Sequence, residues 1–308
     1  MIPPALGARW SALQPASRGL CWFLADQTFL VSTFVLIKWL GAHHSIFQIV
    51  FLRLAIGLVV LLPTIARLGP VGLRTRRFGG HMLRNVLSTV GMCCSYLALT
   101  RLPLADATLV SFTGPLIMTV LAVLLLGEKV RWRRWSAVGV GFSGVVLIAQ
   151  PSAGTPLDAL GIALFGTFVT CLSVATAKNL LRHEPAMQVT IWYTMLSLVL
   201  AAPLGIWFWQ WPTAADWVLF VGVGLLATAG HYCFLRAYAE ADAGYLAGFG
   251  YVRLLFAIAV GYFVFDEVPT EWTLAGAAVI LTSAVYVGWR EAQVGRKATG
   301  PSRGGAPR

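Results

Sequence analysis

The sequence has little charge, and least of all negative charge. Only 12 of its 308 residues are aspartate or glutamate, and charged residues of both signs make up 11% of the chain, against roughly 25% in a typical soluble domain. Hydrophobic residues make up 58%, and the mean hydropathy is +0.76. So few charged side chains cannot cover a surface that faces water. This excludes an ordinary soluble protein and predicts a polytopic membrane protein.

Patterns that would indicate an enzyme or a cofactor are also missing. The five cysteines are odd in number and lie in apolar segments, and neither they nor the five histidines have the spacing of a metal site. No P-loop motif GxxxxGK[ST] occurs, so the chain is not expected to hydrolyse ATP. A membrane-embedded enzyme would need a cluster of histidine or acidic residues near one interface, whereas the acids here are scattered. We expect no catalytic residue, no metal and no cofactor.

What the sequence does have is long apolar runs. About twenty apolar residues cross a bilayer as a helix, and ten runs qualify, with these approximate bounds: 19–38, 46–66, 80–99, 105–126, 134–150, 157–178, 187–207, 217–236, 243–265 and 272–289. They are too long and too continuous for the strands of a membrane barrel. We predict an all-α integral membrane protein with ten transmembrane helices. Residues 1–18 hold no apolar run, so we expect a cytoplasmic N-terminal segment rather than a signal peptide.

The basic residues predict the direction of the helices. If the N-terminus is cytoplasmic, 19 of the 23 lysines and arginines fall on the inner side, and only Lys38 and Arg101 on the outer side. By the positive-inside rule both termini are cytoplasmic, in a multi-pass plasma membrane (the cell inner membrane if bacterial), and residues 290–308 form a basic cytoplasmic tail. Because the basic residues sit in short clusters between apolar runs, the net charge of +11 indicates lipid headgroups as its partner, not nucleic acid.

The two halves of the chain repeat one another. Ala-Asp-Ala at 105–107 recurs at 241–243, an offset of 136, and Tyr96 and Tyr232 each lie ten residues before the aspartate. Five spans is an odd number, so the second copy must enter the membrane from the opposite side. Inverted repeats of this kind are a transporter architecture, with the substrate site near the midplane where the halves meet. We predict two inverted five-helix repeats, residues 19–150 and 157–289.

Helix breaks lie at matching positions in the two repeats. Gly114-Pro115 interrupts the fourth span, and the same offset places Gly250 in the ninth. Proline removes a hydrogen bond within the helix, so a freed carbonyl near Ser111 would face a cavity. Paired breaks of this kind point to a binding site. The alternative is a kink that serves packing only.

Three charged residues lie deep inside the predicted spans, at least seven residues from either end. A charge near the bilayer centre costs about 2.5–3.5 kcal/mol, so each is a candidate for function. Asp26 is expected either to carry protons or a cation, or to make a structural hydrogen bond with Gln27. Arg53 is a candidate for the site or a brace between helices. Arg253 is expected to anchor an anionic group of the solute.

Three aromatic residues near these charges are further candidates. Trp192, His231 and Tyr251 would suit a cavity for an aromatic or zwitterionic solute. Aromatic side chains are also common at membrane interfaces, so a structural role for each remains the alternative.

Two runs carry a resemblance to a known family. FLRLAIGLVVLLP (51–63) and YLALTRLPLADATLVSFTGPLIMTVLAVLLLGE (96–128), with weaker echoes of the second in the other half, resemble the EamA-type ten-helix carriers of the drug/metabolite transporter superfamily. The resemblance covers residues 19–289. It implies a pseudosymmetric bundle whose central cavity opens alternately to each side of the membrane. It does not specify the solute.

The expected function is therefore secondary transport by alternating access. The solute would be a small polar or amphipathic metabolite, such as an amino-acid-like, zwitterionic or metal-chelating compound, with protons as a candidate coupling ion. Export is the commoner role among EamA-type carriers and is the expected direction. The alternatives are import of a vitamin or nucleotide-derived metabolite and, from another class, a membrane-embedded enzyme.

Overall fold

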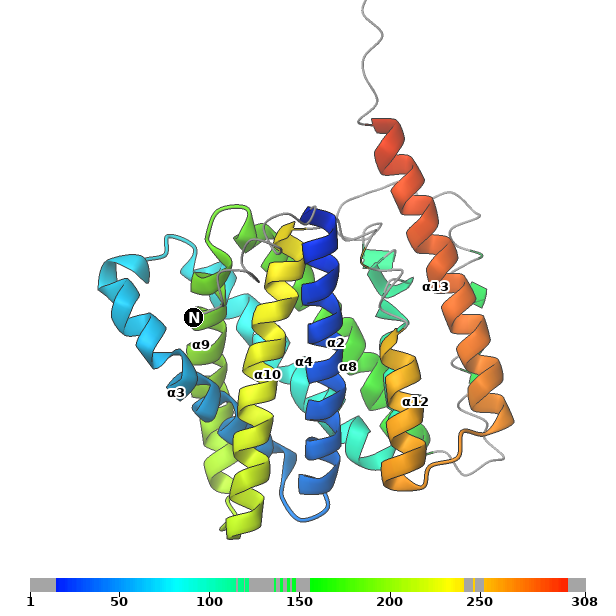
Figure 1. Ribbon diagram of the computed structural model, residues 1–308, viewed down its shortest axis with the longest axis horizontal. Helices are drawn as coiled ribbons and strands as arrows, with labels where there is room; N and C mark the ends of the chain where they lie inside the picture. Colours follow the sequence, from blue (N-terminus) through cyan, green and yellow to red (C-terminus); the bar gives the residue numbers. More distant parts are fainter. Residues whose placement is uncertain are drawn as a thin grey trace, which may run out of the picture.

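The computed structural model describes residues 15–114, 116–118, 120–121, 136, 139–140, 143–144, 146–147, 156–240, 246 and 252–298, and over these ranges every regular element is an α-helix. The helices, labelled as in Figure 1, are α2 (Pro15–Leu40), α3 (Ile46–Gly72), α4 (Phe78–Arg101), α5 (Leu104–Ser111), α8 (Leu157–Leu181), α9 (Ala186–Trp207), α10 (Ala214–Glu240), α12 (Val252–Phe265) and α13 (Glu271–Ala298). The all-helical fold class predicted from the sequence is confirmed for this part of the chain.

Six of these helices are long and apolar enough to cross a membrane, and two shorter apolar helices lie at Leu104–Met118 and Arg253–Phe265. Large apolar side chains cover much of the outer surface: Val59 is 63% exposed, Val199 68% and Trp207 82%. An apolar surface this extensive is a liability in water, but it matches the hydrocarbon of a bilayer. The chain is a multi-pass membrane protein.

Some helix bounds differ from the prediction. Nine helices are assigned in the described residues rather than ten, because the span expected at 134–150 lies mostly outside them. Pro115, Gly250 and Tyr251 also lie outside the described residues. α3 continues past the predicted end at residue 66, with a kink at Gly69 (φ 62°), a left-handed conformation that glycine adopts at little cost. α13 extends to Ala298, so the first part of the predicted cytoplasmic tail is helical.

The fourth predicted span is interrupted ahead of Gly114. α5 ends at Ser111, and Phe112 and Thr113 form a turn in which their backbone N–H groups donate to the carbonyls of Leu109 and Val110. These are bonds three residues back, tighter than those of an α-helix. Helical bonding then resumes, with the Ile117 N–H 2.9 Å from the Thr113 carbonyl oxygen.

The helices pack in a pattern that repeats in the two halves. α2 packs along α10 (Figure 1), while α8, the counterpart of α2, packs along α4, the counterpart of α10. α3 packs on its own counterpart α9, and it also contacts α10 just as α9 contacts α4. Each repeat therefore packs chiefly against helices of the other one, around a pseudo-two-fold axis between α3 and α9.

The two repeats run in opposite directions. Lys38, near the end of α2, donates a hydrogen bond to the carbonyl of Leu102, which follows α4. Arg101, at the end of α4, pairs with Asp158 at the start of α8, at 2.8 Å. α8 therefore begins at the end of the bundle where α2 finishes, as an inverted repeat requires.

Glycine lets the paired helices approach closely. A Cβ added at Gly91 on α4 would lie 2.5 Å from Thr170 Oγ1 and 3.2 Å from the Gly166 carbonyl oxygen on α8. On α10, about one turn beyond the counterpart of Gly91, a Cβ at Gly230 would lie 3.2 Å from the Cβ of Phe29 and 3.6 Å from Asp26 Oδ1. Small residues at such contacts are typical of helix packing in membranes.

Candidate functional site

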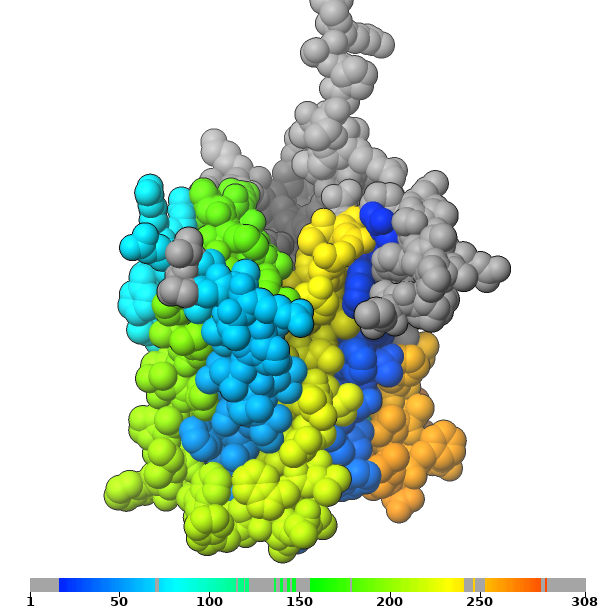
Figure 2. All heavy atoms as spheres, turned by 60° about the vertical axis from the view of Figure 1, so that its left-hand side comes forward, coloured from blue at the N-terminus to red at the C-terminus, as the bar shows by residue number. Residues whose placement is uncertain are grey.

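A pocket lies where the two repeats meet, between α3 of the first and α9 and α10 of the second. Figure 2 shows α3 (light blue) lying over the face between α9 (green) and α10 (yellow). The pocket has a volume of about 250 Å³ including its open mouth. Its polar lining consists of Arg53, Thr190, Tyr193, Thr194, Thr228 and His231. Such a concentration of polar groups inside an apolar bundle marks it as the candidate site.

Arg53 enters this pocket from α3. It is partly buried, and one terminal nitrogen, Nη1, donates to the hydroxyl of Tyr193 at 3.4 Å and contacts the sulfur of Met92. The guanidinium lies over the ring of Tyr96, 6.0 Å from its centroid. The residue thus joins α3 to α4 and α9 while also lining the pocket.

A second arginine contacts Tyr193 from α4, a helix that starts at the opposite end of the bundle from α3. Arg84 is 4% exposed, its guanidinium lies 5.2 Å from the centroid of the Tyr193 ring, and Nη1 donates to the Val189 carbonyl at 3.2 Å. The charge count from the sequence assigned Arg84 to the inner side. It belongs instead with the intramembrane charges, because it lies inside α4 and is buried against α9. The charge bias then becomes 18 to 2, which leaves the predicted orientation unchanged.

His231 completes this group on α10. Its ring stacks on Tyr193, with centroids 4.6 Å apart and an interplanar angle of 19°. Its Nε2 atom is buried and has no hydrogen-bond partner within the described part of the chain. Together with Arg53 and Arg84 it places three nitrogen-bearing side chains around one tyrosine, of which Arg53 and His231 line the pocket.

Asp26, Ser111 and Arg253 form a separate group near α5. Arg253 Nη2 donates to Ser111 Oγ at 2.7 Å, and its guanidinium lies 4.7 Å from the centroid of the Phe112 ring. Asp26 is 7% exposed and accepts a 2.7 Å hydrogen bond from the Gln27 amide. Asp26 and Arg253 lie within electrostatic range of one another where α2 meets α12, although the two side chains do not form an ion pair. The acid that Arg253 lacks in its own repeat is thus supplied by the other.

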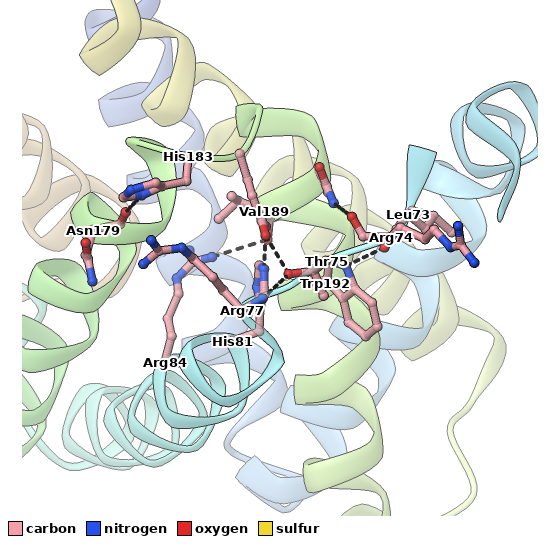
Figure 3. A network of polar contacts seen from close by, with 12 residues as sticks. Leu73, Arg74, Thr75, Arg77, His81, Arg84, Asn179, His183, Val189 and Trp192 are labelled. Carbon is pink, nitrogen blue, oxygen red and sulfur yellow. Dashed lines mark hydrogen bonds and ion pairs between the residues drawn. The ribbon is translucent and has the colours of Figure 1, made fainter. Parts of the chain in front are cut away.

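Trp192 lies outside both groups, in what we call the His81 cluster (Figure 3). Its indole N–H donates to the Leu73 carbonyl at 3.1 Å. Beside it, His81 Nε2 lies 2.6 Å from a carboxylate oxygen of Glu184, which also accepts a hydrogen bond from Thr75. The His81 cluster joins the α3–α4 connection to the α8–α9 connection at one end of the bundle.

Another cluster joins the repeats at the opposite end. In this Lys38 cluster, the Lys38 ammonium pairs with Glu267 and donates to the Leu102 carbonyl at 3.2 Å. Glu267 also accepts the backbone N–H of Leu104, at the start of α5, at 2.8 Å. The left-handed turn at Asp266 (φ 54°) ends α12 just before it. Three chain segments, two from the first repeat and one from the second, thus meet at one ion pair.

The structure brings together some of the residues predicted from the sequence and separates others. Arg53 and His231 share the pocket, Asp26 lies with Ser111 and Arg253, and Trp192 lies apart from both groups. Across the described residues, no group of three or more histidine, cysteine or acidic side chains is placed to hold a metal ion.

Comparisons with known proteins identify the family of this chain. The EamA-like transporter family matches residues 17–150 and again 157–289. The chain is 28% identical over 281 residues to an S-adenosylmethionine uptake transporter of Rickettsia prowazekii (strain Madrid E), a match that spans 91% of this chain and 95% of that one. It is 30% identical over 260 residues to a riboflavin transporter of Vibrio cholerae, spanning 81% and 85%.

A third relative is named for the opposite direction of transport. It is a pseudopaline exporter of Pseudomonas aeruginosa, 26% identical over 266 residues, spanning 85% of this chain and 92% of that one. One solved crystal structure, 19% identical, aligns with a TM-score of 0.64 over 92% of this chain and 99% of that chain, which shows the fold alone. Because a family match covers each of the two repeats, the chain belongs to the EamA-like transporter family.

Proposed function

We propose that the protein is a secondary transporter that carries a small amphipathic metabolite with a ring system across the membrane. The observation that carries this proposal is the pocket between the repeats, with residues of α3 on one side and of α9 and α10 on the other. Relatives named for S-adenosylmethionine and riboflavin support a solute with a ring, and Tyr193 and His231 give the pocket aromatic side chains.

The direction that we propose is uptake. Export was the expectation from the sequence, but the comparisons do not support it, because they include relatives named for uptake as well as one named for export. Uptake of a nucleotide-derived or vitamin solute was the alternative considered there, and it agrees with the names of two relatives.

The mechanism that we propose is alternating access. The empty space of about 250 Å³ at this pocket includes its open mouth, so little of it is enclosed, and the surrounding helices must separate to admit such a solute. The Lys38 cluster and the His81 cluster each join the two repeats at one end of the bundle. Each would have to open when the pocket faces its side.

We further propose ten transmembrane helices with both termini in the cytoplasm, which puts the His81 cluster at the cytoplasmic end and the Lys38 cluster at the outer end. The charge bias supports this orientation. Asp26 is the proposed site of proton coupling, because it is a buried carboxyl group that lies between helices of the two repeats, α2 and α10.

Transport by the purified full-length protein tests this function. In proteoliposomes, labelled S-adenosylmethionine or riboflavin should accumulate faster than in empty liposomes, with saturation and with competition by the unlabelled solute. Metabolite profiling of cells with and without the protein would extend the search to other ring-bearing solutes. If neither solute moves, and if no such metabolite changes in those cells, the proposed function is wrong.

A further inference from the structure

Two positive charges meet inside the bundle at Tyr193. Arg53 and Arg84 belong to helices that start at opposite ends of the bundle. Each lies roughly 10 Å past the start of its helix at 1.5 Å per residue. Arg53 reaches the hydroxyl of Tyr193 at 3.4 Å, and Arg84 lies over the ring at 5.2 Å. Each charge at this depth costs several kcal/mol unless something compensates it.

No carboxylate compensates them within the described part of the chain. The groups that contact the two guanidinium groups are a thioether, a phenol hydroxyl, aromatic rings and a backbone carbonyl, all of them neutral. The Nε atoms of both arginines are buried without a hydrogen-bond partner there. Arg253, the third intramembrane arginine, differs because Asp26 lies within its electrostatic range.

The two arginines are not equally free to bind a ligand. Arg84 is behind Tyr193, and one of its terminal nitrogens is occupied by the Val189 carbonyl. Arg53 lines the pocket directly, among hydroxyl groups of Thr190, Thr194 and Thr228. One guanidinium therefore faces the pocket, and the charge of the other lies close behind it.

We propose that this pocket binds a carboxylate group of the transported solute. Arg53 would hold the carboxylate through two parallel N–H donors. The charge of Arg84 would strengthen the attraction in a region of low dielectric. A single accessible guanidinium fits a single carboxylate better than a phosphate dianion. The proposal rests on the proposed transport function and adds the chemical group by which the solute is recognised. Of the two solutes named above, S-adenosylmethionine carries a carboxylate and riboflavin does not, so the proposal favours the first.

Acetate is the probe that tests the site, because it offers a carboxylate and almost nothing else. Thermal unfolding of the purified full-length protein would be compared in sodium acetate and in sodium chloride of equal ionic strength and pH. At acetate concentrations about ten times the dissociation constant, the midpoint should rise by roughly 2–4 °C. The rise should disappear in Arg53→Gln and shrink in Arg84→Gln.

Arg253→Gln is the matched control, since it also removes a buried arginine, but one whose neighbours are Ser111 and Asp26. Its midpoint in chloride is expected to fall, yet acetate should still raise it. If Arg53→Gln cannot be purified, Arg53→Lys replaces it. That variant keeps the charge but loses the paired donors, so it should need several-fold more acetate for the same rise.

Three outcomes would overturn the proposal: no rise in the native protein, an equal rise in Arg53→Gln, or a larger rise with inorganic phosphate than with acetate. These outcomes are independent of transport. If acetate binds at Arg53 but neither S-adenosylmethionine nor riboflavin is carried and no ring-bearing metabolite changes, the carboxylate site stands and the proposed solute class fails.

Discussion

Removing the ion pair between Lys38 and Glu267 should make one end of the bundle open more often. The two side chains are 16% and 21% exposed. Losing one partner of a fully buried pair costs about 3–5 kcal/mol, whereas exposed pairs contribute about 0–1 kcal/mol. For a pair buried to this extent, Lys38→Met should cost the closed state about 2 kcal/mol. That corresponds to a shift of about 30-fold toward the state open at this end.

A cysteine in the pocket would report this shift. Thr194 lines the pocket. The Thr194→Cys substitution would be made in a variant that lacks the five native cysteines. A small impermeant thiol reagent added from the Lys38 side should then label it tens of times faster after Lys38→Met. The charge exchange Lys38→Glu with Glu267→Lys should recover only part of the closed state, because a lysine at 267 cannot accept the Leu104 N–H.

Arg101→Met is the matched control for the Lys38 experiment. Arg101 pairs with Asp158 at the same end, but the two side chains are 49% and 62% exposed, so losing that pair should change labelling by less than about fivefold. If Lys38→Met labels no faster than Arg101→Met, the Lys38 cluster does not hold this end closed.

Three further predictions follow from the packing and the orientation. Asp26→Asn should abolish uptake driven by a proton gradient while leaving counterflow of the solute largely intact; unchanged gradient-driven uptake would give Asp26 a structural role only. Single cysteines at Arg76 and Trp211 should react with an impermeant reagent from opposite sides of the membrane, cytoplasmic and outer respectively, and labelling of both from one side would contradict the proposed orientation. Gly91→Val should destabilise the fold by about 1–3 kcal/mol through overpacking, seen as a lower unfolding midpoint, whereas Gly79→Val, with open space around it, should have a much smaller effect.

Much of the fold was predictable from the sequence because a membrane helix needs a long apolar run, and such runs are visible without a structure. The bounds were less predictable. α3 is kinked at Gly69, where glycine adopts φ 62°, and resumes as far as Gly72. Arg84, near the start of α4, is buried against α9. A charge near the start of a predicted span can belong to the loop or to the membrane, and only the packing of the helix decides.

The candidate site was predictable only in part. The sequence marks Arg53 and His231 as unusual, but their meeting at Tyr193 depends on how the repeats cross. Arg53 and Tyr193 are 140 residues apart, close to the repeat offset of 136, so they occupy nearly equivalent positions on α3 and α9. Contacts of this kind become predictable once α3 and α9 are known to meet on the axis. The pairing of Lys38 with Glu267 gives no comparable signal.

The way the repeats cross also bears on how the protein is made. α2 packs chiefly along α10, yet α2 ends at Leu40 and α10 begins at Ala214. At roughly 5–20 residues per second, synthesis of the intervening chain takes on the order of 10–35 s. During that time the helix that carries Asp26 stays in the bilayer without its main partner. The carboxyl group of Asp26 therefore reaches its buried position against α10 only after the second repeat has been inserted.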